Sequence, residues 1–135
     1  MIRKMKDIVV IDLFCGIGGL TNGLKKAGIN VKAGIDFDKR CKYAYEVNNG
    51  ALFIGEDISN ISGRDLNEIW GKDNIKVLVG CAPCQPFSTH SNKIKDKELG
   101  SKWYLLNEYL RLIEETNPLV VSMENVTNLA NKDIF

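Results

Sequence analysis

The sequence predicts an α/β fold built on an open, mostly parallel sheet with helices on both faces. Two observations lead to this class. Apolar runs rich in β-branched residues alternate along the chain with stretches of helical periodicity. Glycines or polar residues break each apolar run at once, as where a buried parallel strand enters a turn. With 135 residues, 44% of them hydrophobic, the chain is expected to form one domain.

The first half of the chain predicts three strands, at 7–14, 31–36 and 51–55. A helix after "CGIGG" is expected to close at Gly28 as its C-cap. A second helix is predicted from Asp38, as N-cap, to about Asn48.

The second half predicts a helix at 63–71, with Ser62 as cap and Asp65 three residues on. A strand at 76–80 and a long loop at 81–101 follow, and loops of that length are usually functional. A helix is predicted at 103–115, stopped by Asn117–Pro118 and followed by a strand at 119–124. Its apolar stripe is expected to contain Trp103, Leu106, Leu110 and Ile113.

Charge and composition exclude several classes of protein. Eighteen Lys and Arg against seventeen Asp and Glu give a net charge of +1, without the basic field of a self-sufficient nucleic-acid binder. No stretch is apolar enough to predict a membrane span or a cleaved leader, so a cytoplasmic protein is expected. The cysteines are therefore expected to be reduced thiols, namely Cys15, Cys41, Cys81 and Cys84.

The glycine turn after the first strand predicts a nucleoside site. Gly16, Gly18 and Gly19 allow close backbone approach and aim amide N–H groups at a ligand. Asp36 lies twenty residues beyond Gly16, where a carboxylate can bind both ribose hydroxyls. The pattern is not a P-loop, and its third glycine departs from the dinucleotide spacing. A purely structural turn stays an alternative.

Two further residues support the nucleoside interpretation. Phe37 can stack on a purine, and Asp57, after the third strand, can accept from an exocyclic amine. Burial in the core is the alternative for Phe37, and capping of the next segment is the alternative for Asp57.

The segment "GCAPCQPFS", 80–88, allows three interpretations. Cys81 and Cys84 have the spacing of a redox dithiol, and with His90 they supply three of the four ligands of a zinc site. In the third interpretation Cys84 is a single nucleophile and Cys81 a small buried residue at the strand end. Glu124, kept protonated by burial, would then be the general acid, the alternative being a solvated strand-end acid.

Three segments, "DLFCGIGGLT", "GCAPCQPFS" and "MENV", resemble the first, fourth and sixth motifs of the cytosine-5 DNA methyltransferases. The resemblance runs from about Ile8 to Leu129. It implies a Rossmann-like sheet of the S-adenosylmethionine-dependent methyltransferases, incomplete at its C-terminal end. Residues 1–135 would be the amino-terminal part of one catalytic domain, without the target-recognition region.

The resemblance also implies roles for single residues. Cys84 would add to carbon 6 of a flipped cytosine, Glu124 would protonate or hydrogen-bond ring nitrogen 3, and carbon 5 would take the methyl group. Asn125 would position the Pro–Cys loop, and the other substrate-positioning residues would be Gln85, Ser88 and Val126. No metal is implied. The cofactor, S-adenosyl-L-methionine, would be bound by Phe14, Gly16, Gly18, Gly19, Asp36, Phe37, Asp57, Ile58, Pro83 and Leu105.

Compared with the family, the sequence contains no Gln-x-Arg-x-Arg segment and no carboxy-terminal helix to pack beside the first motif. We therefore expect a DNA methylase, of the kind found in restriction-modification systems, that is a fragment or one half of a split enzyme. Its partners would be DNA and a second polypeptide carrying the missing motifs. A tRNA-methylating member of the family and a non-catalytic remnant that binds cofactor or DNA are the alternatives.

Overall fold

The computed structural model describes residues 7–83 and 96–125, with the backbone alone for 96–103. Its strands are β1 (Ile8–Leu13), β2 (Asn30–Ile35), β3 (Leu52–Ile54), β4 (Ile75–Gly80) and β5 (Val120–Met123). Its helices are α1 (Gly19–Lys26), α2 (Lys42–Asn49), α3 (Gly63–Trp70) and α4 (Asp96–Thr116), with short 3₁₀ turns η1 (Lys39–Cys41) and η2 (Ile58–Asn60).

The described strands form one parallel sheet in the order β3-β2-β1-β4-β5. The chain moves outward from β1 to β3, then crosses back to place β4 on the other side of β1. This reversal puts the switch point of the sheet between β1 and β4, where open α/β sheets bind ligands at the carboxyl ends of their strands. The predicted fold class is confirmed.

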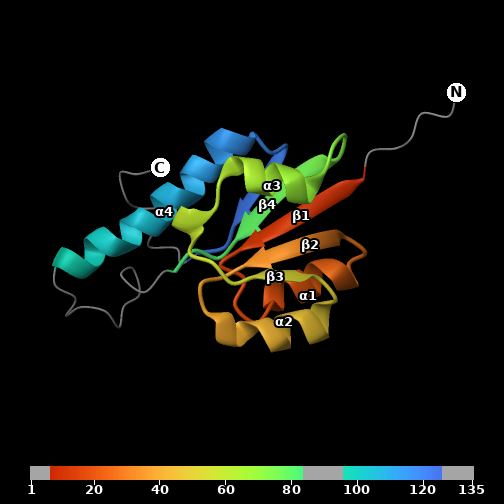
Figure 1. Ribbon diagram of the computed structural model, residues 1–135, viewed down its shortest axis with the longest axis horizontal. Coiled ribbons are helices and arrows are strands. Elements are labelled where there is room, and N and C mark those ends of the chain that lie inside the picture. Colours follow the sequence, from red (N-terminus) through yellow and green to blue (C-terminus); the bar gives the residue numbers. More distant parts are fainter. Residues whose placement is uncertain (1–6, 84–95, 126–135) are drawn as a thin grey trace, which may run out of the picture.

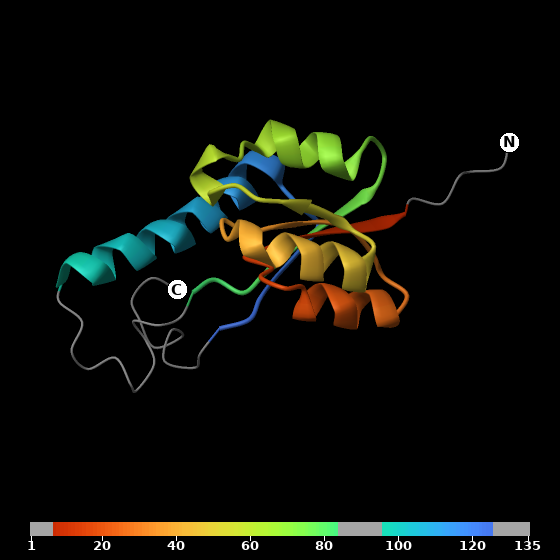
Figure 2. The ribbon, with the colours of Figure 1, turned by 60° about the horizontal axis from the view of Figure 1, so that its bottom comes forward.

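Helices cover both faces of the sheet: α1 and α2 lie on one face, and α3 and α4 on the other (Figures 1 and 2). The larger core lies under α3 and α4, where Trp70, Leu66 and Leu112 are fully buried against β1 and β4. The indole Nε1 of Trp70 donates to the carbonyl oxygen of Val9 at 3.0 Å, so this ring fixes α3 to the central strand.

The other face is closed by Tyr45 of α2. Its ring packs beside Phe53 and lies so close to Gly34 that an added Cβ there would be 2.4 Å from the tyrosine. The smaller clusters on this face join Val10, Val31 and Val79 to α1, and Cys15 to α2. The glycine in β2 therefore lets α2 pack directly on the sheet.

Helix termini follow the local signals of the sequence. Ser62 and Asp65 form a reciprocal capping box at the start of α3. Asp38 caps the 3₁₀ turn η1, which leads into α2. After α1, Ala27 is the C-cap and Gly28 is the left-handed residue that follows it, with φ +81°.

Two predictions about α4 are wrong. The helix begins at Asp96, so the loop predicted to run to 101 ends earlier; the polar start of the helix carries no apolar periodicity. The apolar stripe is also displaced, because Leu110 is 40% exposed while Tyr109 and Leu112 are buried beside Leu106. The side chain of Trp103 lies outside the described part. In 7–83 and 96–125, no helix is long and apolar enough to cross a membrane.

Candidate active site

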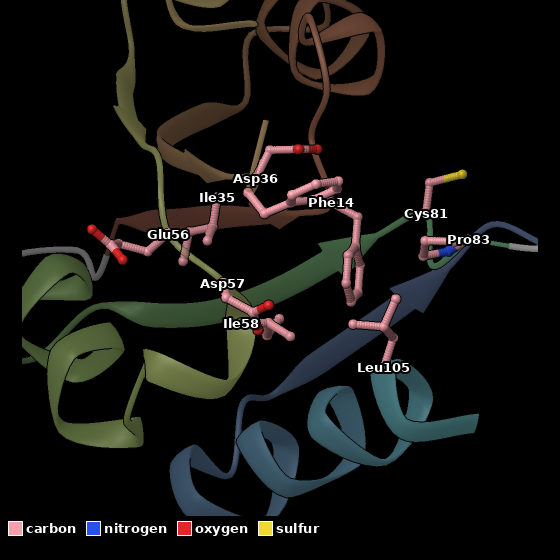
Figure 3. Close-up of a pocket in the computed structure, with 10 residues that line it drawn as sticks. Phe14, Ile35, Asp36, Glu56, Asp57, Ile58, Cys81, Pro83 and Leu105 are labelled. Carbon is pink, nitrogen blue, oxygen red and sulfur yellow. The ribbon is translucent and has the colours of Figure 1, made fainter. Parts of the chain in front are cut away.

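A cavity of about 140 Å³ opens at the carboxyl ends of the strands, as predicted from the topology. Figure 3 shows the ring of Phe14 in its middle, with Asp36 on one side and Leu105 on the other. Seven of the predicted cofactor residues line it: Phe14, Asp36, Phe37, Asp57, Ile58, Pro83 and Leu105. Three lining residues were not predicted as cofactor contacts, namely Ile35, Glu56 and Cys81.

Asp36 ties the first two strand ends together. Its Oδ2 accepts from the backbone N–H of Gly16 at 2.8 Å, and its Oδ1 accepts from that of Asp38 at 2.9 Å. Phe14 and Gly16 adopt left-handed φ angles of 56° and 50°, which turn the chain so that the Gly16 amide meets the carboxylate. Each carboxylate oxygen keeps a second lone pair. The carboxylate can therefore still accept from a pair of vicinal hydroxyls.

Gly18 and Gly19 do not line this cavity but border a second, more open hollow between α1 and α2. Gly18 has φ +91°, and a Cβ there would lie 2.3 Å from the side chain of Asn49 and 2.7 Å from that of Tyr45. The glycine is thus required for packing, as in the structural alternative for this turn. Contact of Gly16, Gly18 or Gly19 with a cofactor stays a prediction.

Asp12, which was not singled out from the sequence, lies beneath the glycine turn and is 1% exposed. Its carboxylate accepts a hydrogen bond from the hydroxyl of Thr21 at 2.6 Å, and that hydroxyl is 3.0 Å from the hydroxyl of Tyr45. Burial raises the pKa of Asp12 to about 6, although hydrogen bonds from Thr21 oppose the shift. A buried acid therefore joins β1, α1 and α2 below the predicted cofactor site.

The far wall of the cavity comes from the segments after β2 and β3. Phe37 is 75% exposed, so the alternative that it belongs to the core is wrong, and its ring is accessible for stacking. Asp57 caps η2 by accepting from the N–H and the hydroxyl of Ser59, through Oδ1, at 2.9 and 2.7 Å. These bonds lower the pKa of Asp57. The capping interpretation of Asp57 is confirmed, and the residue lines the cavity as well.

The edge formed by β4 and β5 differs from its prediction in two ways. Glu124 is exposed, so the prediction that it is buried is wrong. Cys81 is only partly buried; its Sγ donates to Oε2 of Glu124 at 2.7 Å. Asn125 donates from Nδ2 to the carbonyl oxygen of Ala82, the residue before Pro83, at 3.3 Å, and its role in positioning the Pro–Cys loop stays a prediction.

Several predicted residues lie outside the described part of the chain, namely Cys84, Gln85, Ser88, His90 and Val126. The choice between a dithiol, a zinc site and a single nucleophile therefore rests on the sequence. Among the described residues, no group of three or more His, Cys, Asp and Glu is placed to hold a metal ion.

The unpredicted lining residues had weak signals. Glu56 directly follows a predicted strand, as Asp57 nearly does, and position alone does not decide which acid faces a ligand. In Figure 3 the Glu56 carboxylate points away from Phe14. Free cysteine is usually buried, and this residue type is the basis for predicting that Cys81 is buried. Its hydrogen bond to Glu124 depends instead on β5 lying beside β4.

Comparisons with known proteins agree with this geometry. A family model described as C-5 cytosine-specific DNA methylase matches residues 8–134. The Type II methylase M.HgiDII of Herpetosiphon aurantiacus is 55% identical over 117 residues, which cover 87% of this chain and 32% of that protein. M.HhaI, a Type II methyltransferase of Haemophilus parahaemolyticus, is 32% identical over 131 residues, covering 97% of this chain and 37% of that protein.

Solved structures show the same sheet. A prophage-encoded E. coli protein described as a DNA modification methyltransferase superposes with a TM-score of 0.73 at 30% identity, covering 91% of this chain and 33% of its own. The Dnmt2 methyltransferase of S. pombe matches in fold, with a TM-score of 0.67 at 24% identity over 95% of this chain and 37% of its own. The chain thus spans about a third of the length of these relatives.

Proposed function

The chain belongs to the C-5 cytosine-specific DNA methylase family, and we propose that it is the amino-terminal part of an enzyme that methylates carbon 5 of cytosine in DNA. One observation carries the proposal. The cavity joins the carboxylate of Asp36 and an exposed aromatic, Phe37, to Cys81 and Pro83, which come shortly before the predicted nucleophile in the sequence. The predicted cofactor residues thus share one cavity with Pro83, the residue before the predicted nucleophile in the sequence.

The residues of the cavity suit S-adenosylmethionine, whose sulfonium centre supplies an electrophilic methyl group when the cofactor is bound. Asp36 would accept from the ribose hydroxyls, Phe37 would stack on adenine, and Asp57 and Ile58 would contact its edge. A cavity of about 140 Å³ is smaller than the ~300–1,000 Å³ of typical ligand pockets. It would therefore enclose only part of the cofactor.

The chain's own residues would then prepare the cytosine. The thiolate of Cys84 forms a bond to carbon 6, and Glu124 shares a proton with ring nitrogen 3, so that carbon 5 becomes nucleophilic. After methylation, carbon 5 loses its proton to a base and the bond from sulfur to carbon 6 breaks, which restores the ring and the thiolate. Asn125 would hold the loop during these steps. The base must leave the duplex to reach the thiol.

The thiol of Cys81 donates a hydrogen bond to the exposed side chain of Glu124. We propose that a further part of the protein, on the same polypeptide or a second one, grips DNA and covers this edge. We also propose a cytoplasmic location, in which the cysteines stay reduced.

Methyl transfer tests this function directly. The complete protein, or this chain with a polypeptide carrying the remaining motifs, is incubated with radiolabelled S-adenosylmethionine and either duplex DNA or tRNA. Label at carbon 5 of DNA cytosine is the expected result. Label in tRNA alone would select the tRNA-methylating branch, and cofactor binding without transfer to either would indicate a non-catalytic remnant.

A further inference from the structure

Two residues of α4 connect this helix to the predicted cofactor cavity, namely Leu105 from inside the cavity and Arg111 from outside its wall. Leu105 lines the cavity. About two helical turns later, Arg111 contacts the segment that follows β3, which forms the opposite wall through Asp57 and Ile58. The guanidinium is thus a second link between α4 and the wall that we expect to meet adenine.

Arg111 holds this wall by its backbone. Its Nη2 donates to the carbonyl oxygen of Ile61 at 2.9 Å and to that of Ile58 at 3.2 Å. The Ile58 carbonyl also accepts from the N–H of Ile61, which closes the η2 turn. Ile58 is buried, and it lines the cavity. Because the guanidinium binds the backbone carbonyl of Ile58, it fixes the position of a residue in the cavity wall.

Two acids fix the guanidinium in turn. Arg111 donates from Nε to Glu108 and from Nη1 to Glu115, both at 2.8 Å. The second carboxylate oxygen of Glu115 accepts from the N–H of Gly63 at 2.6 Å, at the first turn of α3. A Cβ at Gly63 would lie 2.5 Å from Glu115, so the two helices touch at this point. The contacts of Arg111 and Glu115 therefore span residues 58–63.

We propose that Arg111 is a positioning residue of the cofactor site: it holds the wall formed by Asp57 and Ile58, and so sets cofactor affinity without contacting the cofactor. The identity of the ligand rests on the proposed function. A planar guanidinium, with five donors in fixed directions, suits four acceptors on three sides, whereas a lysine ammonium has three donors at a single point.

A change in the position of α4 would reach the wall through Arg111 and the cavity through Leu105. Without Arg111 the wall can move in the unbound protein and must be ordered when the cofactor binds. We therefore expect loss of Arg111 to weaken cofactor binding by at least about tenfold, the cost of fixing the backbone of about one residue.

The experiment compares Arg111→Met and Arg111→Lys with Arg64→Met in the full chain. Arg64 forms an exposed pair with Glu68 on α3 and has no contact with the wall, so it is the matched control. Calorimetric titration with S-adenosylmethionine measures affinity, and amide hydrogen exchange without ligand measures how firmly residues 59–63 are held. We expect Arg111→Met to bind at least about tenfold more weakly, Arg111→Lys to lie between, and Arg64→Met to change affinity less than twofold.

In the exchange experiment, the amides of Asn60, Ile61 and Gly63 should exchange faster in Arg111→Met, while those of β1 and β4 should not. Wild-type affinity and wild-type exchange in Arg111→Met would overturn the proposal. Equally faster exchange through the whole sheet would also overturn it, since Arg111 would then be merely structural. If the wild type bound no cofactor, the proposed function would fail, and unchanged exchange at Ile61 would separately contradict the positioning role.

Discussion

The carboxylate within β1 and those after β2 and β3 are held more firmly than the one after β5. At the cofactor end, which comprises Asp12, Asp36 and Asp57, each acid accepts from donors within the described fold. At the transfer end, which comprises Cys81, Glu124 and Asn125, Glu124 is exposed and accepts from the Cys81 thiol. The adjoining strand, β5, is exposed to solvent as well. Val120, its first residue, is 49% exposed, and Leu119, before it, is 73% exposed.

This difference separates binding from chemistry. Groups already fixed by their own hydrogen bonds lose little freedom when a ligand arrives, so the cofactor end is preorganised. We expect the carboxyl group of Glu124, at the transfer end, to be enclosed only when the substrate and a further part of the protein cover it. We therefore expect substitutions at the cofactor end to change stability and affinity, and substitutions at the transfer end to change the rate of methyl transfer.

The largest effect should come from the predicted nucleophile. Cys84→Ala should reduce methyl transfer by the complete protein below detection, because no other group adds to carbon 6. Cys81→Ala removes a hydrogen bond to Glu124 and should leave measurable turnover. Both variants should bind S-adenosylmethionine as the wild type does. Equal loss of transfer in the two variants would contradict a single nucleophile.

The buried acid of the cofactor end should make stability depend on pH. Since burial raises the pKa of Asp12 to about 6, the folded state binds its proton more tightly than the unfolded state. Relative to Asp12→Asn, the wild type should therefore lose about 2 kcal/mol of unfolding free energy as the pH rises from 4 to 7, since acids with lowered pKa values, such as Asp38 and Asp57, affect both proteins alike. Urea unfolding at pH 4 and pH 7 measures this. Asp7→Asn, at an exposed acid, is the control, and parallel profiles of wild type and Asp12→Asn would refute the assignment.

Two glycines of the first turn and helix should respond with opposite signs. Gly18→Ala should destabilise the fold by about 2 kcal/mol, because the position has a positive φ and its Cβ would overlap Asn49 and Tyr45. Gly23, inside α1, has nothing within 4 Å of an added Cβ, so Gly23→Ala should stabilise by about 0.5–1 kcal/mol. Thermal unfolding of both variants tests the pair. Equal shifts would mean that Gly18 is not a packing requirement.

The last effect that we predict is on affinity. Asp36→Asn should weaken S-adenosylmethionine binding by about tenfold or more, because the amide cannot accept from both ribose hydroxyls and from the N–H groups of Gly16 and Asp38. Asp38→Asn changes an exposed ion pair with Arg40 and should have less than a threefold effect. Titration calorimetry compares the two, and similar affinities would remove Asp36 from the binding site.

Local signals made much of this architecture predictable. Strand ends followed from β-branched runs broken by glycine, and the capping box at Ser62 from its spacing to Asp65. Parallel strands bring their carboxyl ends to one edge, so Asp36 and Asp57 could be placed at one site although they lie far apart in sequence. Phe14 joins them only through the family resemblance. Strands, helices and caps can be inferred from chain order and periodicity, because these signals lie in residues that are neighbours in the sequence.

Contacts between distant elements were not predictable in the same way. α4 carries apolar residues around much of its circumference, so periodicity could not decide that Tyr109 is buried and Leu110 exposed. The hydrogen bond from Cys81 to Glu124 depends on the register of β4 with β5. The hydrogen bond from Arg111 to Ile61 depends on the packing of α4 against η2. Each joins residues more than forty positions apart, for which the sequence has no local signal.

The central claim is that Cys84 forms a covalent bond to cytosine beside the cofactor end. DNA containing 5-fluorocytosine tests it, because fluorine replaces the proton that must leave carbon 5, and the methylated adduct therefore persists. The complete protein is incubated with this DNA and S-adenosylmethionine, denatured, digested and analysed by mass spectrometry. We predict a nucleotide adduct on the peptide containing Cys84, at the Cys84 sulfur. Cytosine methylation without an adduct, or an adduct at Cys81, would contradict the account.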